Sequence, residues 1–454
     1  MAFISQNPAT GDEIARYDAL TPEALDEKLD QSVKAFQHHR QTALAERSER
    51  LRRLADTLEE NTERYAKLMT REMGKPLTQA ISEVEKCAWV CRYYAAQGAD
   101  MLRPEMVQTD ASKSYVTYQP LGPILAVMPW NFPFWQVFRF AAPALMAGNV
   151  VLLKHAPNVT GCALEIEQIV ASANFAQHAF QTLLISEEQV AATIDDRRVK
   201  GVTLTGSGRA GSAVGKAAGG AIKPSVLELG GSDPFIVLAD ADLPDAAETA
   251  MNSRMQNNAQ SCIAAKRFIV EEPVYDAFAE RIVARVEALA VGDPMEESTD
   301  LGPLARADLR DHLHDQVQRS INQGATLRTG GTAVDGPGYF YQPTVLSEVK
   351  PGTVAFEEEL FGPVAVLIKA ADADEAVRLA NATPFGLGGA VFTDDRKRGE
   401  AVALRLECGC AFVNGMVKSD PRLPFGGVKA SGYGRELSRY GLREFVNIKT
   451  VWIA

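Results

Sequence analysis

Residues 123–133 read PILAVMPWNFP, a short apolar run that ends in a turn rich in proline and aromatic residues. The run at 124–128 has the length and composition of a buried strand. Similar apolar runs recur at 150–153, 182–185, 202–205 and 226–229, with segments long enough for helices between them. This rhythm is typical of a parallel sheet with crossover helices and predicts an α/β fold.

A second alternation of the same kind begins near residue 234. Its apolar runs lie at 235–238, 267–270, 364–368 and 411–413, and they predict a second parallel-sheet domain. The segments 114–118 and 445–452 have the pattern of exposed strands. We expect these two to pair with each other or with another subunit.

Three helices are expected before the first sheet. The first starts at the Thr-Pro pair of residues 21–22, where a hydroxyl cap precedes a proline in the first turn. A second apolar pattern at helical spacing runs over 51–68 and stops at the Gly-Lys-Pro of 74–76. A third helix is predicted over 77–96.

Composition narrows the class of protein. The chain has 454 residues, 46% of them hydrophobic, so two or three domains with a large core are expected. A formal charge of −11 argues against a nucleic-acid partner. Neither a secretory signal nor an apolar run of about eighteen residues is visible, so we expect no membrane span. Six cysteines without zinc-type spacing predict no metal site and a reduced, cytoplasmic location.

Cys262 ends the stretch NNAQSC and is flanked by small and polar residues, as a nucleophilic cysteine can be. Glu228 lies in an apolar segment and precedes two glycines, a setting that suits a general base. Each feature is weak alone, because a free cysteine is usually a small buried hydrophobe. Cys87 and Cys91, one turn apart on a predicted helix, fit that core role far better than a metal pair.

Residues 206–211 read GSGRAG, which follows a predicted strand and opens a predicted helix, as a dinucleotide site requires. Backbone donors at such a helix start favour a phosphate. Glu228 follows Gly206 by 22 residues, where a Rossmann domain places the acid that binds ribose. Spacing alone therefore leaves Glu228 two roles, ribose ligand or catalytic base, and the glycines could also form a simple packing turn.

Two further polar residues end predicted strands. Asn131, held between two prolines, suits an amide donor to a developing oxyanion, although a turn-forming asparagine is the alternative. Lys154 ends the run at 150–153, at the sheet edge where ligand contacts gather, although a solvated lysine is nearly as common there. The segment 357–363, EEELFGP, combines an acidic run with a fixed turn.

Seven motifs, in one order, resemble the NAD(P)-dependent aldehyde dehydrogenase superfamily. They are PWNFP from 129, Lys154 after its strand, TGS from 205, ELGG from 228, Gln260 with Cys262, EELFGP from 358 and PFGGVKASG from 424. The resemblance covers nearly the whole chain, from NPATG at 7–11 onward. Within the superfamily the chain looks closest to bacterial succinate-semialdehyde dehydrogenases.

The resemblance implies a role for each motif. Cys262 would be the nucleophile that forms a thiohemiacetal and then a thioester, Asn131 the oxyanion donor, and Glu228 the base that activates water for hydrolysis. NAD and/or NADP would be held by Trp130, Lys154, Pro157, Gly206, Ser207, Leu229, Glu359 and Phe361. The implied partner is a small-molecule aldehyde.

The substrate residues follow the family pattern only in part. Arg139 matches the arginine that succinate-semialdehyde members use for the substrate's carboxylate. A second family arginine is replaced by Gln256, and a family serine aligns with Asp420, although Ser419 is adjacent. We therefore expect succinate semialdehyde, with another short carboxylated aldehyde such as glutarate semialdehyde as the alternative. A CoA-acylating enzyme is disfavoured because such members tend to lack the acid at Glu228.

Three positions depart from the family. Ala259 replaces a glycine, a change that is tolerable if φ at this position is below zero and that otherwise alters the shape of the loop. Pro157 stands where many NAD-preferring members have an acid that binds ribose, so both NAD and NADP should be accepted. Ala264 replaces the second cysteine of a redox pair, so no such disulfide forms at Cys262.

The resemblance also implies how the chain divides. Residues 1–101 and 121–229 would form the cofactor-binding domain and residues 230–437 the catalytic domain. Residues 102–120 and 438–454 would form an antiparallel oligomerisation element. We expect a homodimer or homotetramer.

Overall fold

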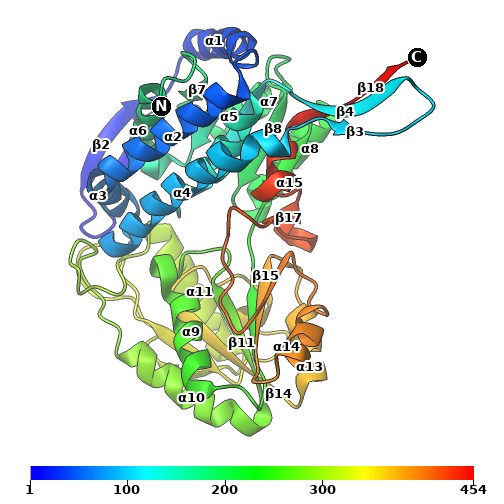
Figure 1. Ribbon diagram of the computed structural model, residues 1–454. Coiled ribbons are helices and arrows are strands. Elements are labelled where there is room, and N and C mark those ends of the chain that lie inside the picture. The colour runs from blue at the N-terminus through cyan, green and yellow to red at the C-terminus, as the bar shows by residue number, and fades with distance from the viewer. Residues whose placement is uncertain (1) are drawn as a thin grey trace.

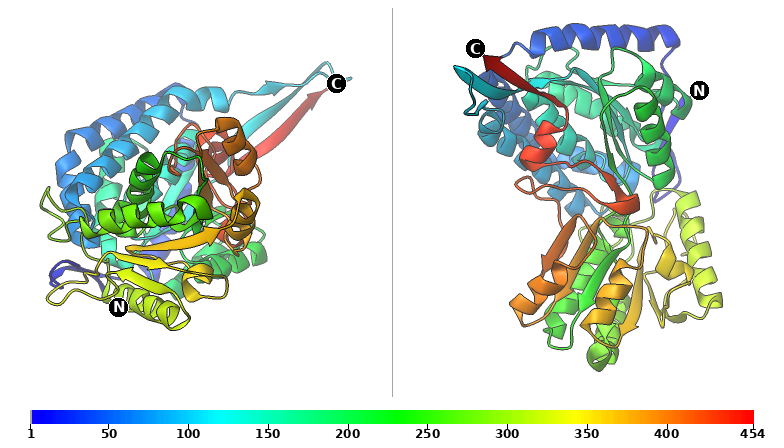
Figure 2. Two further views of the ribbon diagram at one scale, coloured as in Figure 1. Left: turned by 90° about the horizontal axis from the view of Figure 1, so that it is seen from below. Right: turned by 90° about the vertical axis from the view of Figure 1, so that its right-hand side faces the viewer.

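The computed structural model describes residues 2–454, so residue 1 of the predicted first domain lies outside the described residues. Two lobes, each with helices around a sheet, are joined by a narrower waist, and a strand-built arm projects from the upper lobe (Figure 1). Figure 2 shows the waist from the side, with the C-terminal segment returning to the upper lobe.

The sheet of the upper lobe has six strands in the order β17-β9-β8-β5-β6-β7, parallel except at β17. They are β5 (Pro123–Met128), β6 (Val150–His155), β7 (Phe180–Thr182), β8 (Gly201–Thr205), β9 (Ser225–Glu228) and β17 (Gly432–Tyr433). The expected alternation is confirmed, but the strand predicted at 182–185 is misplaced. The last paired residue of β7 is Thr182, although the Leu183 amide still donates to the Leu153 carbonyl of β6 at 2.7 Å. Leu183 and Ile185 are both buried, so the apolar run continues beyond the end of the strand.

The sheet of the lower lobe has seven strands in the order β12-β13-β14-β11-β10-β15-β16, parallel except at β12. The predicted strands are β10 (Asp233–Val237), β11 (Ala265–Glu271), β14 (Val364–Ala370) and β16 (Cys410–Val413). The sequence patterns did not predict β12 (Thr326–Thr329), β13 (Thr344–Ser347) and β15 (Gly388–Phe392).

The first helix, α1 (Pro22–His39), begins as expected, with the Thr21 hydroxyl accepting from the amide of Ala24. The single helix predicted over 51–68 is wrong, because it divides into α2 (Leu44–Glu60) and α3 (Thr62–Met73). At the break Asn61 donates its side-chain amide to the Thr57 carbonyl, 3.0 Å away. Side chains that bond nearby backbone in this way compete with a continuous helix.

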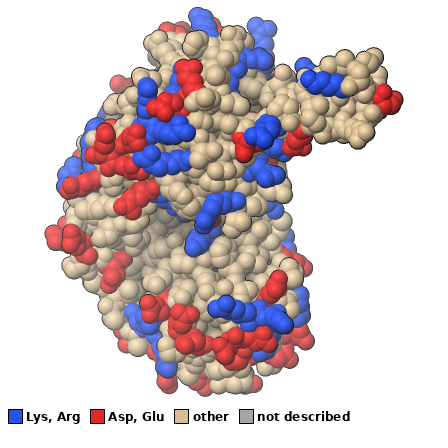
Figure 3. All heavy atoms as spheres, viewed as in Figure 1, with Lys and Arg blue, Asp and Glu red and all other residues tan. Residues whose placement is uncertain are grey.

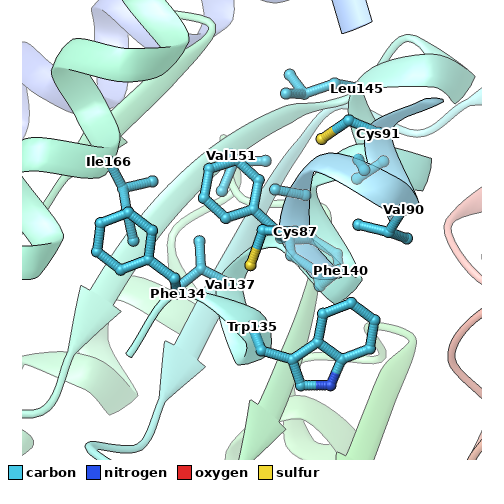
Figure 4. Packing of buried hydrophobic residues seen from close by; sticks show 14 of the residues in the cluster. Cys87, Val90, Cys91, Phe134, Trp135, Val137, Phe140, Leu145, Val151 and Ile166 are labelled. Atoms are coloured by element: carbon cyan, nitrogen blue, oxygen red, sulfur yellow. The ribbon is translucent and has the colours of Figure 1, made fainter. Parts of the chain in front are cut away.

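Helices α4 (Leu77–Met101) and α5 (Trp135–Ala147) pack together beside the upper sheet. Figure 4 shows Cys87 and Cys91 of α4 among apolar side chains that include Val137 of α5. Both thiols are fully buried, and burial raises the pKa of each. The two cysteines are core residues, as their spacing on a helix indicated.

The remaining helices cover the two sheets or connect their strands. They are α6 (Thr160–Ser172), α7 (Glu187–Asp195), α8 (Gly208–Gly220), α9 (Leu243–Met255), α10 (Glu272–Glu287), α11 (Ala307–Asn322), α12 (Val354–Glu357), α13 (Ala373–Asn381), α14 (Arg396–Ala403) and α15 (Ser438–Arg443). A hairpin of β1 (Ala2–Gln6) and β2 (Glu13–Asp18) opens the described chain. Over residues 2–454, no helix is both long and apolar enough to cross a membrane.

The arm contains the two strands that the sequence left without a certain partner. Strand β18 (Val446–Ile453) pairs antiparallel with β4 (Lys113–Pro120) over its whole length, and β3 (Glu105–Met106) pairs with the other edge of β4. Pairing within the chain is therefore the correct alternative. The arm nevertheless keeps apolar side chains in solvent, since Ile448 is 63% and Trp452 54% exposed.

Candidate active site

The segment that carries Cys262 connects α9 to β11 through the 3-10 helix η2 (Gln256–Ala259). Asn257, Asn258 and Ala259 all have left-handed backbones, with φ of 58°, 56° and 60°. Asparagine tolerates this region better than most residues. The Asn258 side-chain amide also donates to the carbonyls of Gly74, at 2.7 Å, and Pro303, at 2.9 Å. Contacts from other parts of the chain thus hold the turn that presents the cysteine.

Ala259 does not meet the condition of a φ below zero, since its φ is 60°. A left-handed alanine brings its Cβ close to the following carbonyl oxygen, at a cost of roughly 1–2 kcal/mol. The methyl group is fully buried in the core of the lower lobe, and the Ala259 carbonyl accepts from Arg254 Nη1 at 3.3 Å. Burial of the methyl group and this hydrogen bond offset the strain, which explains how alanine occupies a position that suits glycine.

Cys262 and Glu228 come from the two different lobes and meet at the waist. The Cys262 thiol points at Glu228 Oε2 across 3.8 Å, and both residues are buried. Burial raises the pKa of both groups, and the charge of Glu228 further raises that of the thiol. The Glu228 carboxylate therefore lies where it can accept the thiol proton, whereas the Glu228 backbone carbonyl accepts from the Gly206 amide of the glycine-rich turn at 3.0 Å.

Lys266, at the start of β11, contacts the backbone of the nucleophile loop, and the sequence motifs did not indicate this contact. Its ammonium group donates to the carbonyls of Ser261 at 2.9 Å and Cys262 at 2.8 Å, and forms an ion pair with Glu359 Oε1 at 3.2 Å. The lysine is 1% exposed. In the sequence Lys266 is only a charged residue that precedes the apolar run of β11, and this pattern does not distinguish it from a lysine in solvent.

Asn131 follows β5 and lies against the nucleophile loop. Its Nδ2 donates to the Gln260 carbonyl at 3.0 Å, and its own carbonyl accepts from the Asn257 side chain at 2.8 Å. One Nδ2 hydrogen is thus used to fix the side chain, and the second is available to a ligand. This geometry suits an amide that is positioned in advance of the reaction.

Arg139, on α5, lies between two carboxylates. Its Nη2 donates to Glu228 Oε2 at 3.2 Å, and its Nε lies 2.6 Å from Glu436 Oε2. The arginine is 1% exposed. Its positive charge lowers the pKa of Glu228, opposing the effect of burial, whereas the pKa of Glu436 is still raised by burial to about 7. Glu436 lies beyond the last sequence motif, which ends at residue 432, so no pattern in the sequence indicated its role.

A cavity of about 250 Å³ opens at Cys262. Arg139, Gln256 and Ser419, the three residues expected to bind substrate, all line it together with the cysteine. Figure 3 shows Lys and Arg side chains beside the hollow between the two lobes. Aromatic side chains, among them Trp135 and Phe425, form much of the remaining wall. The cavity therefore combines an apolar lining with cationic groups.

The glycine-rich turn at 206–211 fits a phosphate-bearing ligand. Ser207 caps α8 by accepting from the Ala210 amide at 3.3 Å. A Cβ on Gly211 would come within 2.6 Å of the Leu229 side chain, so this glycine permits close packing of helix on strand. A Cβ on Gly208 would meet nothing within 4 Å. The exposed helix start thus offers backbone donors with open space before them.

The other residues expected at the adenosine end lie where β6 stops. Lys154 is 6% exposed, and burial lowers the pKa of its ammonium group. His155 bonds the Pro133 carbonyl through Nε2 at 2.8 Å, and burial lowers its pKa to about 4. Pro157 begins the 3-10 helix η1 (Pro157–Val159). The side chains of residues 154–157 therefore carry one cation and no carboxylate.

The residues expected at the nicotinamide end lie nearer the nucleophile. Glu359 Oε1 accepts from the Gly231 amide at 3.1 Å and also contacts Lys266. The rings of Trp130 and Phe361 meet edge to face, 5.8 Å apart. The predicted cofactor residues therefore form two groups, one at the ends of β6 and β8 and one beside Cys262.

The buried cysteine and glutamate lie between two parallel sheets, and one of these sheets carries a helix start of the dinucleotide-binding type. Together these features define a dehydrogenase that works through a thiol. The chain belongs to the aldehyde dehydrogenase family, whose model matches residues 2–451.

Similar proteins match over the full length. A probable succinate-semialdehyde dehydrogenase (NADP(+)) of Synechocystis sp. is 52% identical, with 100% of each chain covered. A succinate semialdehyde dehydrogenase (NAD(P)+) of Escherichia coli is 49% identical, over 99% of this chain and 97% of the other. The crystal structure of succinic semialdehyde dehydrogenase from Streptococcus pyogenes with NADP+ has a TM-score of 0.97, 38% identity and 99% coverage of both chains.

Proposed function

We propose that this enzyme oxidises succinate semialdehyde to succinate with NADP or NAD as cofactor. The observation that carries the proposal is the cavity at Cys262, which has an apolar wall and cationic side chains that suit a short aldehyde with a carboxylate tail. The relatives named above, about half identical to this chain, support the same substrate.

The chain's own residues supply the nucleophile, the oxyanion donors and the base. Cys262 attacks the aldehyde carbon as the thiolate, after its proton has passed to Glu228 or to solvent, while the Asn131 amide and the Cys262 backbone N–H stabilise the oxyanion. A bound nicotinamide cofactor supplies the hydride acceptor. Any proton that Glu228 took from the thiol first passes to solvent, so that the carboxylate is ionised again. It then deprotonates a water that attacks the thioester on Cys262, which releases the acid and the Cys262 thiolate, and the thiolate takes up a proton.

Both forms of the cofactor fit the adenosine end. Lys154 offers a cation to a 2′-phosphate, and no carboxylate at 154–157 either binds the 2′-hydroxyl or repels the phosphate. Trp130, Glu359, Phe361 and the Leu229 backbone would hold the nicotinamide end. The relatives are named for NADP(+) or NAD(P)+, in agreement with this proposal.

A panel of aldehydes tests the proposal directly. Steady-state rates of NAD and NADP reduction are compared for succinate semialdehyde, glutarate semialdehyde and butanal, with and without CoA. We expect the highest kcat/KM for succinate semialdehyde and no acceleration by CoA. A kcat/KM for butanal equal to that for succinate semialdehyde would contradict the proposed substrate, and a rate that depends on CoA would indicate acyl transfer.

Replacing Asn131 by alanine is expected to lower kcat by roughly 10²–10³-fold, the usual effect of removing one oxyanion donor. The amide acts mainly in the transition state, so KM should change much less than kcat. Asn447→Ala, on the exposed arm, provides the matched control. If the Asn131 variant had the same kcat as the wild type, Asn131 would not be an oxyanion donor.

Replacing Arg139 by methionine is expected to move the acid limb of the kcat–pH profile to higher pH. Arg139 lowers the pKa of Glu228, so its loss raises that pKa. The base must be ionised to act, hence a higher pKa means that activity is lost at a higher pH as the solution is acidified. Arg139→Lys keeps the charge and should move the profile less. An unshifted acid limb in the methionine variant would contradict this positioning role.

We also infer that the arm of β3, β4 and β18 contacts a second copy of the chain, giving a homodimer or homotetramer in the cytoplasm. Exposed Ile448, Trp452 and Met106, the last 66% exposed, provide the apolar surface. All six cysteines are free, as suits a reducing compartment. Light scattering of the wild type and of Trp452→Glu tests the contact, and a monomeric wild type would exclude it.

A further inference from the structure

The cavity contains a cation that sequence comparison did not single out. Lys86, on α4, lines the same space as Cys262. Its Nζ donates to Ser419 Oγ at 2.9 Å and lies 4.3 Å from the centre of the Trp135 ring. Within residues 2–454, no carboxylate oxygen lies within 4.0 Å of this ammonium group, so it has no ion-pair partner.

The nearest carboxylates already have partners. Glu83 forms an ion pair with Lys75 and accepts the backbone amides of Phe134 and Trp135, each at 2.9 Å. Asp420, in the loop beside Ser419, pairs with Arg422 at 2.6 Å. The charge of Lys86 is therefore left for a ligand in the cavity.

Arg139 is less free to bind the ligand than its place in the cavity suggests. Its Nε and Nη2 face Glu436 and Glu228, so two carboxylates already surround one guanidinium group. A substrate carboxylate beside Arg139 would be the third carboxyl group to compete for one buried guanidinium group, which is unfavourable at low dielectric. The same carboxylate beside Lys86 would instead form the first ion pair of that ammonium group.

We propose that Lys86, with the hydroxyl of Ser419, binds the distal carboxylate of the substrate, while Arg139 acts mainly to position Glu228. Ser419 Oγ accepts a hydrogen from Lys86 and keeps its own hydroxyl hydrogen to donate. The two side chains thus offer one charged and one neutral donor to the same carboxylate. This assignment rests on the proposed function, because it requires an aldehyde with an acidic tail.

The ionisation of Lys86 gives the site a signature in pH. Burial, and then the charge of Arg139 on α5, lower the pKa of Lys86 to about 8, opposed by Glu83 on α4 and Asp420 in the adjoining loop. Lys418 in that loop also lines the cavity. As the pH rises through about 8, Lys86 loses its charge. We therefore expect kcat/KM for succinate semialdehyde to fall relative to that for butanal, which has no carboxylate.

Lys86→Met tests the assignment through the ratio of kcat/KM for succinate semialdehyde to that for butanal. A hydrogen bond to a charged group contributes about 1.5–3 kcal/mol, so this ratio should fall by roughly 10–100-fold, mainly through KM for succinate semialdehyde. Lys86→Arg should retain most of the ratio, and Ser419→Ala should lower it by a smaller factor. Lys67→Met, on the exposed surface of α3, controls for the loss of one positive charge.

The outcomes separate this inference from the proposed function. If kcat/KM of the wild type were the same for succinate semialdehyde and butanal, both the proposed function and the role of Lys86 would be overturned, because the enzyme would not distinguish the carboxylate. A large wild-type ratio that Lys86→Met leaves unchanged would overturn only the role of Lys86. A fall of the same size for Lys67→Met would likewise exclude a specific contact. If the methionine variant fails to fold, the Ser419→Ala ratio and the wild-type decline above pH 8 decide the question.

Discussion

Cys262→Ala is expected to abolish aldehyde-dependent reduction of NAD and NADP. Removal of a single catalytic nucleophile typically lowers kcat by about 10⁴-fold or more, because the remaining groups cannot form a covalent intermediate. Ser261 also lines the cavity, but an alcohol is far harder to deprotonate than a thiol. The variant should therefore retain no measurable steady-state rate with any aldehyde.

The control for Cys262→Ala must separate lost chemistry from lost structure. Cys410→Ala removes a half-buried thiol from β16 in the same lobe and should leave turnover intact. Both variants should still bind NADPH, as measured by the quenching of tryptophan fluorescence. A normal rate for Cys262→Ala would show that the reaction does not pass through this thiol.

The environment of the thiol shows which parts of the active site could be predicted from the sequence. The motifs placed Cys262, Glu228 and Asn131 in one family pattern, but spacing left Glu228 either a ribose ligand or a base. In the fold its Oε2 lies 3.8 Å from the Cys262 sulfur, which favours the second role. The decisive information is a distance between two lobes, and no local pattern in the chain contains it.

Other parts of the site depend entirely on tertiary contacts. Glu436 meets Arg139 only because the C-terminal segment returns to the upper lobe, far along the chain from α5 (Figure 2). Lys86 and Lys266 are ordinary lysines in the sequence, and only the fold brings them to a hydroxyl group and a carbonyl group to which they donate. The left-handed Ala259 likewise follows from contacts that fix its loop, so the sign of its φ could not be read from the sequence.

The α/β class, by contrast, could be predicted because it depends on repeated local patterns. Apolar runs such as that of β5 are buried on both faces of a parallel sheet, and they need little context to be recognised. The strand β15, with sequence GGAVF, lacked such a pattern because two glycines begin it. Its burial in the sheet is set by neighbouring strands rather than by its own composition.

Glu228→Gln is expected to stop turnover after one round of cofactor reduction. Glutamine keeps the shape of the side chain but accepts no proton, and loss of a general base usually costs about 10²–10⁴-fold. If hydrolysis is the step that needs the base, rapid mixing should give a burst of up to one NADPH per site, followed by a slow steady state. Hydroxylamine, a stronger nucleophile than water, should then release the acyl group and restore turnover.

The size of that burst also separates the two proton transfers open to Glu228. A full burst requires that Cys262 can lose its proton without the carboxylate, so the base would act mainly on water. Loss of both burst and turnover would instead show that the 3.8 Å contact with the thiol is needed for acylation, because burial otherwise keeps the thiol protonated. Glu436→Gln is the matched control, because it removes a carboxylate on the far side of Arg139 from Glu228. This variant should show no burst of NADPH followed by a slow steady state, and hydroxylamine should not raise its rate. A Glu228→Gln enzyme that turns over at the wild-type rate would exclude the carboxylate from both steps.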